Sequence, residues 1–257
     1  MTQPVFIVTG ASKGIGLAVV VALVSRLGSC VVGTGRTPAT DLPAQLRALP
    51  STQFVYVAGD CTDSGLHQQL VQTALDRWAR LDGLVLNAGI LEPIQRIAEA
   101  DLSQWRRLMD INFFSVVELT QRCLTHLRAS KGRIVLVSSG AAVNAYTGWA
   151  PYCTSKAAMN MFSRGLAIEE PDIVTVALRP GVVDTGMQSL IRSDGLAGMT
   201  SEQHSKFVQL KEDGNLLPPE KPGLAIALLV RYGEASLSGE FVNWDDARVA
   251  AYTAHAE

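Results

Sequence analysis

A phenol and an ammonium group lie four residues apart in the stretch APYCTSKAA, residues 150–158. The stretch is typical of the start of a helix, where residues i and i+4 share a face, so Tyr152 and Lys156 are expected to lie together. A tyrosine has an unperturbed pKa of about 10, and a nearby ammonium lowers it by favouring the phenolate. Such a pair could donate a proton to a developing alkoxide. The same spacing also occurs in ordinary amphipathic helices, where the lysine is solvated and the tyrosine half-buried.

The pair is expected to be positioned by alternating strands and helices. Short runs rich in β-branched residues occur at 5–9, 30–34, 53–58, 82–87, 132–138, 173–179 and 239–243. Helical spacing of apolar residues occurs at 15–28, 41–49, 64–80, 101–129, 150–169 and 220–232. Strands with near-continuous apolar runs are typical of parallel sheets covered on both faces. The alternation therefore predicts an α/β fold, a doubly wound, mostly parallel seven-stranded sheet with helices on both faces.

No repeat, low-complexity segment or Pro/Gly/Ser-rich linker divides the chain, so residues 1–257 are predicted to form a single domain. Segment 185–219 differs from the rest because it is polar, holds four glycines and follows the sixth predicted strand. Ligands of open α/β sheets bind beyond the carboxyl ends of the strands. The segment is therefore predicted to be a substrate lid.

Composition and charge disfavour several classes of protein. With 47% hydrophobic and 18% charged residues, the chain is expected to fold rather than to be disordered. The formal net charge is −2 and no run of Lys and Arg exceeds a pair, so a nucleic-acid partner is not expected. No window approaches the roughly 18 uninterrupted apolar residues of a membrane span. Four cysteines without CxxC spacing predict free thiols in a reducing, cytoplasmic compartment, and no metal site is expected.

A glycine-rich loop joins the first predicted strand to the first predicted helix. Its sequence is Thr9-Gly10-Ala11-Ser12-Lys13-Gly14-Ile15-Gly16. Glycines let the backbone approach a pyrophosphate closely, and a helix N-terminus stabilises negative charge. The spacing, G-x3-G-x-G, differs from the common G-x-G-x-x-G fingerprint. The loop is predicted to bind a dinucleotide, and the alternative is a tight turn with no ligand.

The ends of the second and third predicted strands bear on the choice of cofactor. Gly35 stands where an NAD site usually has an acid for the ribose 2′-OH, and Arg36 follows it. Because a guanidinium binds phosphate bidentately, Arg36 with Lys13 favours NADP(H) over NAD(H); a lone surface arginine is the alternative. Asp60, next to Cys61, is predicted either to accept the adenine amino group or to cap the following helix.

Taken together, the motifs resemble the short-chain dehydrogenase/reductase family. They are the glycine loop, Asn87-Ala88-Gly89, Ser139 thirteen residues before Tyr152, Lys156, and Pro180-Gly181. They occur in the order and spacing of that family, and the resemblance extends over about residues 4–246. It implies a Rossmann-like fold, a nicotinamide cofactor, which Arg36 and Lys13 favour as NADP(H), and an oxidoreductase that acts on carbonyl or hydroxyl groups.

The resemblance also implies roles for individual residues. Ser139 would hydrogen-bond the substrate oxygen, Tyr152 would donate the proton, and Lys156 would hold the nicotinamide ribose. Asn112 would hold a water that relays protons to the lysine, unless its side chain only satisfies a local backbone group. The residues expected to contact the cofactor are Gly10, Ser12, Lys13, Gly14, Ile15, Gly16, Arg36, Asp60, Cys61, Asn87, Ala88, Gly89, Tyr152, Lys156, Pro180, Gly181, Val183 and Thr185.

Some stretches resemble one branch of the family, the sepiapterin reductases and benzil reductases. They include GWAPYC at 148–153, LAIEEP at 166–171 and PGVVDTGMQ at 180–188. This resemblance implies reduction of one ketone of a vicinal dicarbonyl to an α-hydroxyketone. Asp246 would anchor the substrate, or be structural or solvated. Trp149 would form a pocket wall, or only pack in the core. Met187 would belong to the apolar part of the lid.

Other interpretations stay open at this point. The substrate could be another ketone, such as a 3-oxoacyl group, and a non-catalytic NADP(H)-sensing protein could share the fold. Helices 101–129 and 150–169 carry apolar residues beyond one narrow stripe. Because relatives usually pair through these helices, a homodimer is expected. The natural substrate, the stereochemistry and the physiological direction do not follow from the sequence.

Overall fold

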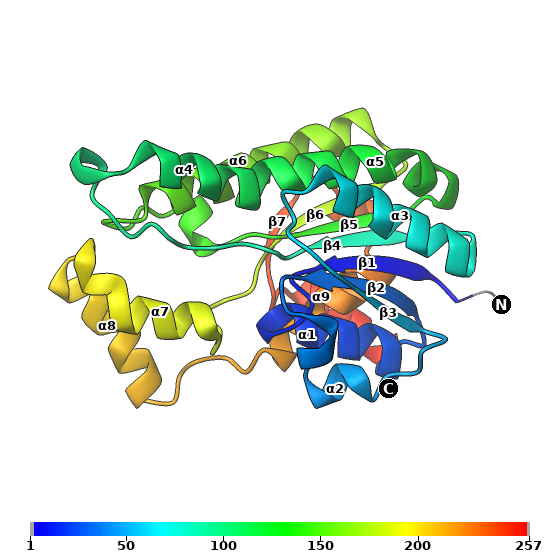
Figure 1. Ribbon diagram of the computed structural model, residues 1–257, viewed down its shortest axis with the longest axis horizontal. Helices are drawn as coiled ribbons and strands as arrows, with labels where there is room; N and C mark the ends of the chain where they lie inside the picture. The colour runs from blue at the N-terminus through cyan, green and yellow to red at the C-terminus, as the bar shows by residue number, and fades with distance from the viewer. Residues whose placement is uncertain (1–2, 256–257) are drawn as a thin grey trace.

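In a computed structural model, the described residues, 3–255, form a seven-stranded parallel sheet with helices on both faces (Figure 1). The strand order is β3-β2-β1-β4-β5-β6-β7. The strands are β1 Val5–Thr9, β2 Cys30–Gly35, β3 Phe54–Ala58, β4 Gly83–Leu86, β5 Arg133–Val137, β6 Val174–Arg179 and β7 Phe241–Asn243. The prediction of a doubly wound seven-stranded sheet is confirmed, and each described pairing in this sheet is parallel.

The helices separate into two layers because successive strand residues point to opposite faces of the sheet. In β1, Phe6 and Val8 enter the core beneath α1, α2 and α9, whereas Val5 and Ile7 enter the core beneath α3, α5 and α6. Figure 1 shows these two groups of helices on opposite sides of the sheet. The helices are α1 Gly14–Val21, α2 Ala44–Arg47, α3 Ser64–Trp78, α4 Leu102–Met109, α5 Ser115–Ser130, α6 Ala150–Glu169, α7 Gly186–Asp194, α8 Ser201–Glu212, α9 Glu220–Tyr232 and α10 Ala247–Ala250. Short 3₁₀ segments occur at Ala39–Asp41, Ile97–Glu99, Gly140–Ala142, Gly195–Ala197, Ala235–Leu237 and Ala251–His255.

The chain reverses its direction of travel across the sheet between β1 and β4. From β1 it moves outward to β2 and β3, and it then returns to place β4 on the other side of β1. Open α/β sheets bind ligands in a crevice beyond the carboxyl ends of the strands at such a reversal, so the loops after β1 and β4 border the expected ligand crevice.

Two predicted helices differ from the structure for identifiable backbone reasons. The single helix expected at 101–129 is α4, then a π-helical turn at Asp110–Phe114, then α5. The helix expected at 41–49 is only the four residues of α2, because Pro43 holds Leu42 in an extended conformation with φ −63° and ψ 144°. A further π-helical turn, Ala22–Arg26, follows α1.

Segment 185–219 is mostly helical and leaves the sheet from one point. It holds α7 and α8, which lie beyond the carboxyl ends of the strands (Figure 1). Its two ends are pinned together, because Asp184 N donates to Leu217 O at 2.9 Å and Leu217 N donates to Val182 O at 2.9 Å. Within residues 3–255 no helix is long and apolar enough to cross a membrane.

Candidate active site

The glycine loop after β1 is held by the loop after β4. Asn87 Nδ2 donates to Thr9 O at 3.0 Å and to Gly10 O at 3.2 Å, and the backbone N–H groups of Asn87 and Ala88 both donate to Thr9 Oγ1 at 3.0 Å. Gly10 has φ +65°, a left-handed conformation that favours glycine. A Cβ on Gly16 would lie 2.1 Å from Gly10 O. The loop is therefore compact, and it leads directly into the N-terminus of α1.

The end of β2 leaves little room for an acidic side chain. A Cβ on Gly35 would lie 3.1 Å from Tyr56 Oη and 3.3 Å from Ser12 Oγ. The Tyr56 hydroxyl is held there, because it donates to Thr37 O at 3.0 Å. The next residue, Arg36, is exposed, as is Lys13 in the glycine loop. The predicted cations are thus accessible, whereas the position of the usual NAD acid is crowded.

Asp60 does not cap the following helix. The cap of α3 is Asp63, whose carboxylate accepts from Gly65 N at 2.8 Å. Asp60 Oδ1 instead accepts from Thr62 N at 3.0 Å and from Thr62 Oγ1 at 2.9 Å, and these hydrogen bonds, the backbone one first, lower its pKa. The helix-capping alternative is therefore wrong, and the adenine role stays a prediction. Cys61 shares this turn, and its carbonyl lies 2.8 Å from His67 Nε2.

The Tyr152–Lys156 pair lies on one face of α6, against the end of β5. Lys156 Nζ is 5.7 Å from the centre of the Tyr152 ring and donates to Val137 O at 2.8 Å. Both side chains are buried, with 6% and 4% exposure. Ser139 follows β5, accepts from Ala141 N at 3.1 Å through its hydroxyl and also hydrogen-bonds the phenol of Tyr152. The structure therefore brings together the three predicted residues Ser139, Tyr152 and Lys156.

Burial favours the neutral form of both members of the pair. It raises the pKa of Tyr152 to about 12, against the opposing effect of the Ser139 hydrogen bond. It lowers the pKa of Lys156 to about 8. At neutral pH the tyrosine is therefore a protonated donor beside a lysine that is still mostly charged. This arrangement can supply a proton and then stabilise the phenolate that remains.

Asn112 connects the loop after β4 to the helix that carries the pair. Its side chain is completely buried in the π-helical turn. Asn112 Oδ1 accepts from Ile90 N at 2.8 Å, and Nδ2 donates to Ile90 O at 2.8 Å and to Ser155 Oγ at 3.2 Å. A Cβ on Gly89 would lie 3.2 Å from Asn112 Oδ1 and 3.7 Å from Lys156 Nζ. Both amide protons are thus donated to protein groups, and the predicted role in a water relay stays a prediction.

The loop after β6 closes the other side of the crevice. Pro180 precedes Gly181, which has φ +81°, and a Cβ there would lie 2.6 Å from Leu217 Cδ1. Val183 is buried and forms a parallel bridge with Leu217. The methyl group of Thr185 faces the glycine loop, because a Cβ on Gly14 would lie 3.1 Å from it. The residues from the loop after β6 therefore approach those from the loop after β1.

The three residues predicted to contact substrate lie in different surroundings. Trp149 is buried in an apolar cluster that also contains Tyr152 and residues of α7 and α8. Met187, at the start of α7, packs against the same cluster. Asp246 instead caps α10, accepting from Arg248 N at 2.9 Å and from Arg248 Nη2 at 2.8 Å, and the Arg248 side chain is the main cause that lowers its pKa to about 2. The anchor role of Asp246 stays a prediction.

Comparison with known proteins agrees with this geometry. The family model described as short chain dehydrogenase matches residues 4–195. The chain belongs to the short-chain dehydrogenase family. It is 46% identical to an uncharacterized oxidoreductase of Schizosaccharomyces pombe, over 94% of this chain and 96% of that protein. It is 42% identical to a benzil reductase of Saccharomyces cerevisiae that forms (S)-benzoin, over 95% of this chain and 97% of that protein.

A solved structure supports the same assignment. The crystal structure of a short chain dehydrogenase/reductase from Saccharomyces cerevisiae superimposes with a TM-score of 0.91, is 37% identical, and covers 97% of this chain and 99% of that one. The family resemblance inferred from the motifs is thus confirmed, as is its benzil-reductase branch. The chain is accordingly an oxidoreductase of CH–OH or C=O groups, and family membership implies a nicotinamide cofactor.

Sequence inspection missed two residues of this site. Tyr146 and Phe207 both lie against Trp149, with ring centres 4.7 and 5.4 Å from it. Phe207 lies in the mostly polar stretch SEQHSKFVQLKE, residues 201–212, where it is the one aromatic residue. An aromatic residue in a mostly polar helix is the signal that could have identified it.

The burial of Lys156 predicts the pH dependence of ketone reduction by this dehydrogenase. With a pKa of about 8, the lysine is charged below that pH and neutral above it. If Tyr152 donates the proton, the ammonium would stabilise the phenolate that forms, so kcat/KM for reduction, which reports ionisations of the free enzyme, is expected to fall as the pH rises through about 8. The measurement is kcat/KM against pH. Lys156→Arg is the control, because arginine keeps its charge and should move the decline to higher pH; an unchanged decline in this variant would contradict the assignment to Lys156.

Proposed function

We propose that the protein is an NADPH-dependent reductase that converts one ketone of a vicinal dicarbonyl into an α-hydroxyketone. The observation that carries the proposal is the position of the Tyr152 phenol, which belongs to the apolar, aromatic cluster that faces α7 and α8. An apolar wall beside the proton donor suits an uncharged aromatic or aliphatic dicarbonyl. The similarity to a benzil reductase over nearly the whole chain supports the same substrate class.

The glycine loop suits a dinucleotide because its glycines let the backbone pack closely on the loop after β4 and lead directly into the N-terminus of α1. Cβ atoms at Gly10 and Gly16 would lie 2.7 and 2.6 Å from Asn87 Nδ2. We propose that the pyrophosphate lies against this loop and the N-terminus of α1, and that Lys156 and Thr185 hold the nicotinamide end. When bound, NADPH supplies the hydride. The remaining predicted contacts, Ser12, Ile15, Asn87, Ala88, Gly89, Pro180, Gly181 and Val183, lie on the loops that border this crevice.

The residues of the protein contribute the transfer of a proton to the carbonyl oxygen of the substrate. The hydroxyls of Ser139 and Tyr152 donate hydrogen bonds to the substrate carbonyl and polarise it. As the oxygen becomes an alkoxide, the Tyr152 phenol transfers its proton to it, and the Lys156 ammonium stabilises the phenolate. A second carbonyl next to the first makes the reacting carbon more electrophilic, so this modest activation suffices.

The preference for NADPH follows from the end of β2. The exposed guanidinium of Arg36 and the exposed ammonium of Lys13 suit a 2′-phosphate. A side chain at Gly35 would press on Tyr56 Oη at 3.1 Å, which disfavours the acid that binds an NAD ribose. The four cysteines are free, which supports a reducing cytoplasmic compartment.

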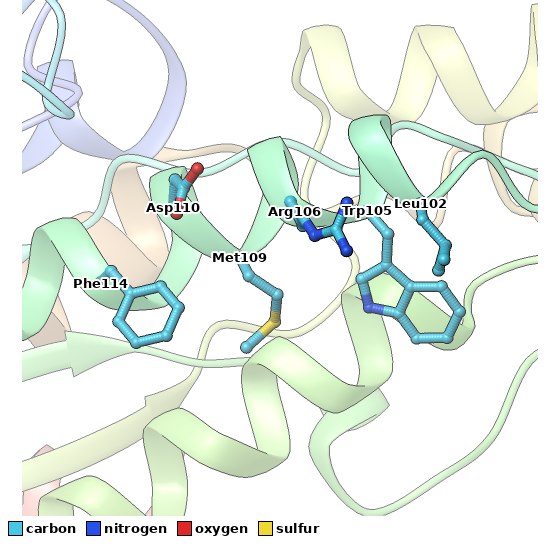
Figure 2. A pocket seen from close by; sticks show the side chains of 6 residues that line it. All are labelled: Leu102, Trp105, Arg106, Met109, Asp110 and Phe114. Atoms are coloured by element: carbon cyan, nitrogen blue, oxygen red, sulfur yellow. The ribbon is translucent and has the colours of Figure 1, made fainter.

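We also propose that the protein is a homodimer that pairs through the layer of α4, α5 and α6. Large apolar side chains stay exposed there, namely Leu102, Phe114, Met161 and Ile168, the last with 81% exposure. A pocket of about 510 Å³ runs along α4 and the π-helical turn, and Figure 2 shows its lining side chains, Leu102, Trp105, Arg106, Met109, Asp110 and Phe114. Exposed apolar surface of this kind marks interaction sites.

We propose that segment 185–219 is the substrate lid. It contributes Met187 and Phe207 to the cluster around Trp149 and Tyr152, and its ends are pinned at one point beside the crevice. A segment with fixed ends and an apolar inner side can move over a substrate without disturbing the sheet.

The substrate class is tested with NADPH and a panel of α-diketones, quinones, pterins and simple ketones. We expect turnover of α-diketones such as benzil, with chiral analysis identifying the hydroxyketone. Tyr152→Phe is expected to lower kcat by about 10²–10⁴-fold while NADPH binding is unchanged, because the general acid is lost. Tyr252→Phe, which removes the hydroxyl of a buried tyrosine that accepts from Glu234 N, is the matched control. No turnover of any α-diketone would refute the substrate class, and a normal rate in Tyr152→Phe would refute the proton donor.

Cofactor selectivity is tested at Arg36. Arg36→Asp is expected to weaken NADPH binding about tenfold to a hundredfold, because charge-assisted hydrogen bonds are lost and a repulsive carboxylate is introduced. Binding of NADH should change far less, and Arg36→Lys should retain part of the preference. Equal changes in the dissociation constants of both cofactors would contradict the assignment.

The dimer is tested by sedimentation equilibrium. The double variant Met161→Glu and Ile168→Glu places charges on the exposed face of α6 and is expected to shift the mass from dimer to monomer. Leu196→Glu introduces the same charge at an exposed apolar residue outside the α4–α6 layer and is expected to leave the dimer intact. A monomeric parent protein, or a double variant that stays dimeric, would overturn the proposal.

A further inference from the structure

Three aromatic rings join the helix α8 to the start of the catalytic helix. We call Tyr146, Trp149 and Phe207 the aromatic stack. Trp149 and Phe207 have ring centres 5.4 Å apart and planes inclined by 28°, and Tyr146 and Trp149 have centres 4.7 Å apart and planes inclined by 34°. Tyr146 and Phe207 complete the triangle at 6.1 Å. Phe207 is the one member that comes from α8.

Trp149 of the aromatic stack also contacts Tyr152, the proposed proton donor. The rings of Trp149 and Tyr152 meet edge to face, with centres 6.0 Å apart and planes inclined by 88°. Pairs of this geometry contribute attraction beyond the area that they bury. Because Trp149 is 5% exposed and Tyr152 is 6% exposed, the indole shields the phenol from water.

Trp149 holds this position although its own polar group is unsatisfied. Within residues 3–255 its buried Nε1 has no hydrogen-bond partner. An unpaired buried donor carries a penalty, and such a group remains buried only where its surroundings hold it. The ring contacts with Tyr146 and Phe207 are among the packing contacts that hold the indole here. The indole is therefore held here by its packing rather than by a hydrogen bond of its own.

The residues just before α6 also contact the proposed lid, segment 185–219, through groups other than the stacked rings. Thr147 N donates to Gln203 Oε1 at 3.0 Å, and a Cβ on Gly148 would lie 2.8 Å from the carbonyl carbon of Gly198. These contacts fix the backbone before α6 against segment 185–219. They do not touch the indole itself, so the placement of that ring against α8 depends on Phe207.

We infer that Phe207 is a positioning residue for proton transfer, which acts through Trp149 to keep the Tyr152 phenol dry and oriented when α8 is seated. The inference rests on the proposed role of Tyr152 as proton donor. It adds to that role a requirement for Phe207 of α8, which lies more than fifty residues further along the chain than Tyr152. Substrate reduction is thereby linked to the seating of the lid, because the donor is fully shielded only when Phe207 lies on Trp149.

The test compares Phe207→Leu, which keeps an apolar side chain but removes the ring, with Phe207→Tyr, which keeps the ring. We expect Phe207→Leu to lower kcat for α-diketone reduction about threefold to tenfold, because a ring pair of this kind is lost. The dissociation constant of NADPH should not change, and Phe207→Tyr should restore kcat. Leu210→Ala is the matched control, because Leu210 packs on the same cluster from the next turn of α8 without a ring, and it should change kcat less than twofold.

A spectroscopic measurement separates positioning from general loss of packing. The fluorescence of Trp149, taken as the difference between each protein and its Trp149→Phe counterpart, should shift to longer wavelength in Phe207→Leu and not in Phe207→Tyr. An unchanged kcat in Phe207→Leu, an equal loss in Leu210→Ala, or an unshifted Trp149 emission would overturn the inference. If Tyr152→Phe is inactive and one of these results is found, the inference alone fails; if Tyr152→Phe retains full activity, the proposed proton donor fails as well.

Discussion

The geometry of the site depends on the side-chain amide of Asn112. Through Ile90 it holds the loop after β4, and through Ser155 it holds α6, so the crevice and the helix with Tyr152 and Lys156 are fixed relative to each other. The amide reaches both because a π-helical turn interrupts the long helix at this residue. Such turns are frequent at functional sites, where they reposition one side chain without ending the helix.

Burial sets the protonation states of Tyr152 and Lys156, and it also limits the pH range over which the lysine stays charged. Desolvation favours the neutral form of both Tyr152 and Lys156, so the phenol keeps its proton while the lysine retains its charge only below a pKa of about 8. The Val137 carbonyl and the Ser139 hydroxyl provide polar partners for the buried pair. An open site would hydrate both groups and weaken their interaction, since charge interactions are screened in water. Shielding of the pair and access of a substrate would therefore compete, and segment 185–219 contributes side chains to the apolar cluster that contains Tyr152.

Much of the fold and the polar part of the site could be predicted from the sequence, because the information is local. Seven apolar runs mark the strands, and the positions of Ser139, Tyr152 and Lys156 follow from strand ends and helix spacing. The π-helical turn could not be predicted, because its amide partners come from distant segments. The short α2 was missed because the pattern of apolar residues outweighed Pro43 in the prediction. The contact of Phe207 with Trp149 depends on how α8 folds back onto α6, which no spacing in the sequence encodes.

The crowding at Gly35 restricts how the cofactor preference of this protein can evolve. A carboxylate at that position would meet the Tyr56 hydroxyl, which is itself fixed by Thr37. An acid introduced at position 35 alone would therefore displace a neighbouring side chain before it gained a ribose contact. A smaller residue at position 56 introduced alone would leave a void and gain nothing. The two positions are therefore coupled, and an acid at position 35 is expected to be better accommodated when position 56 changes with it.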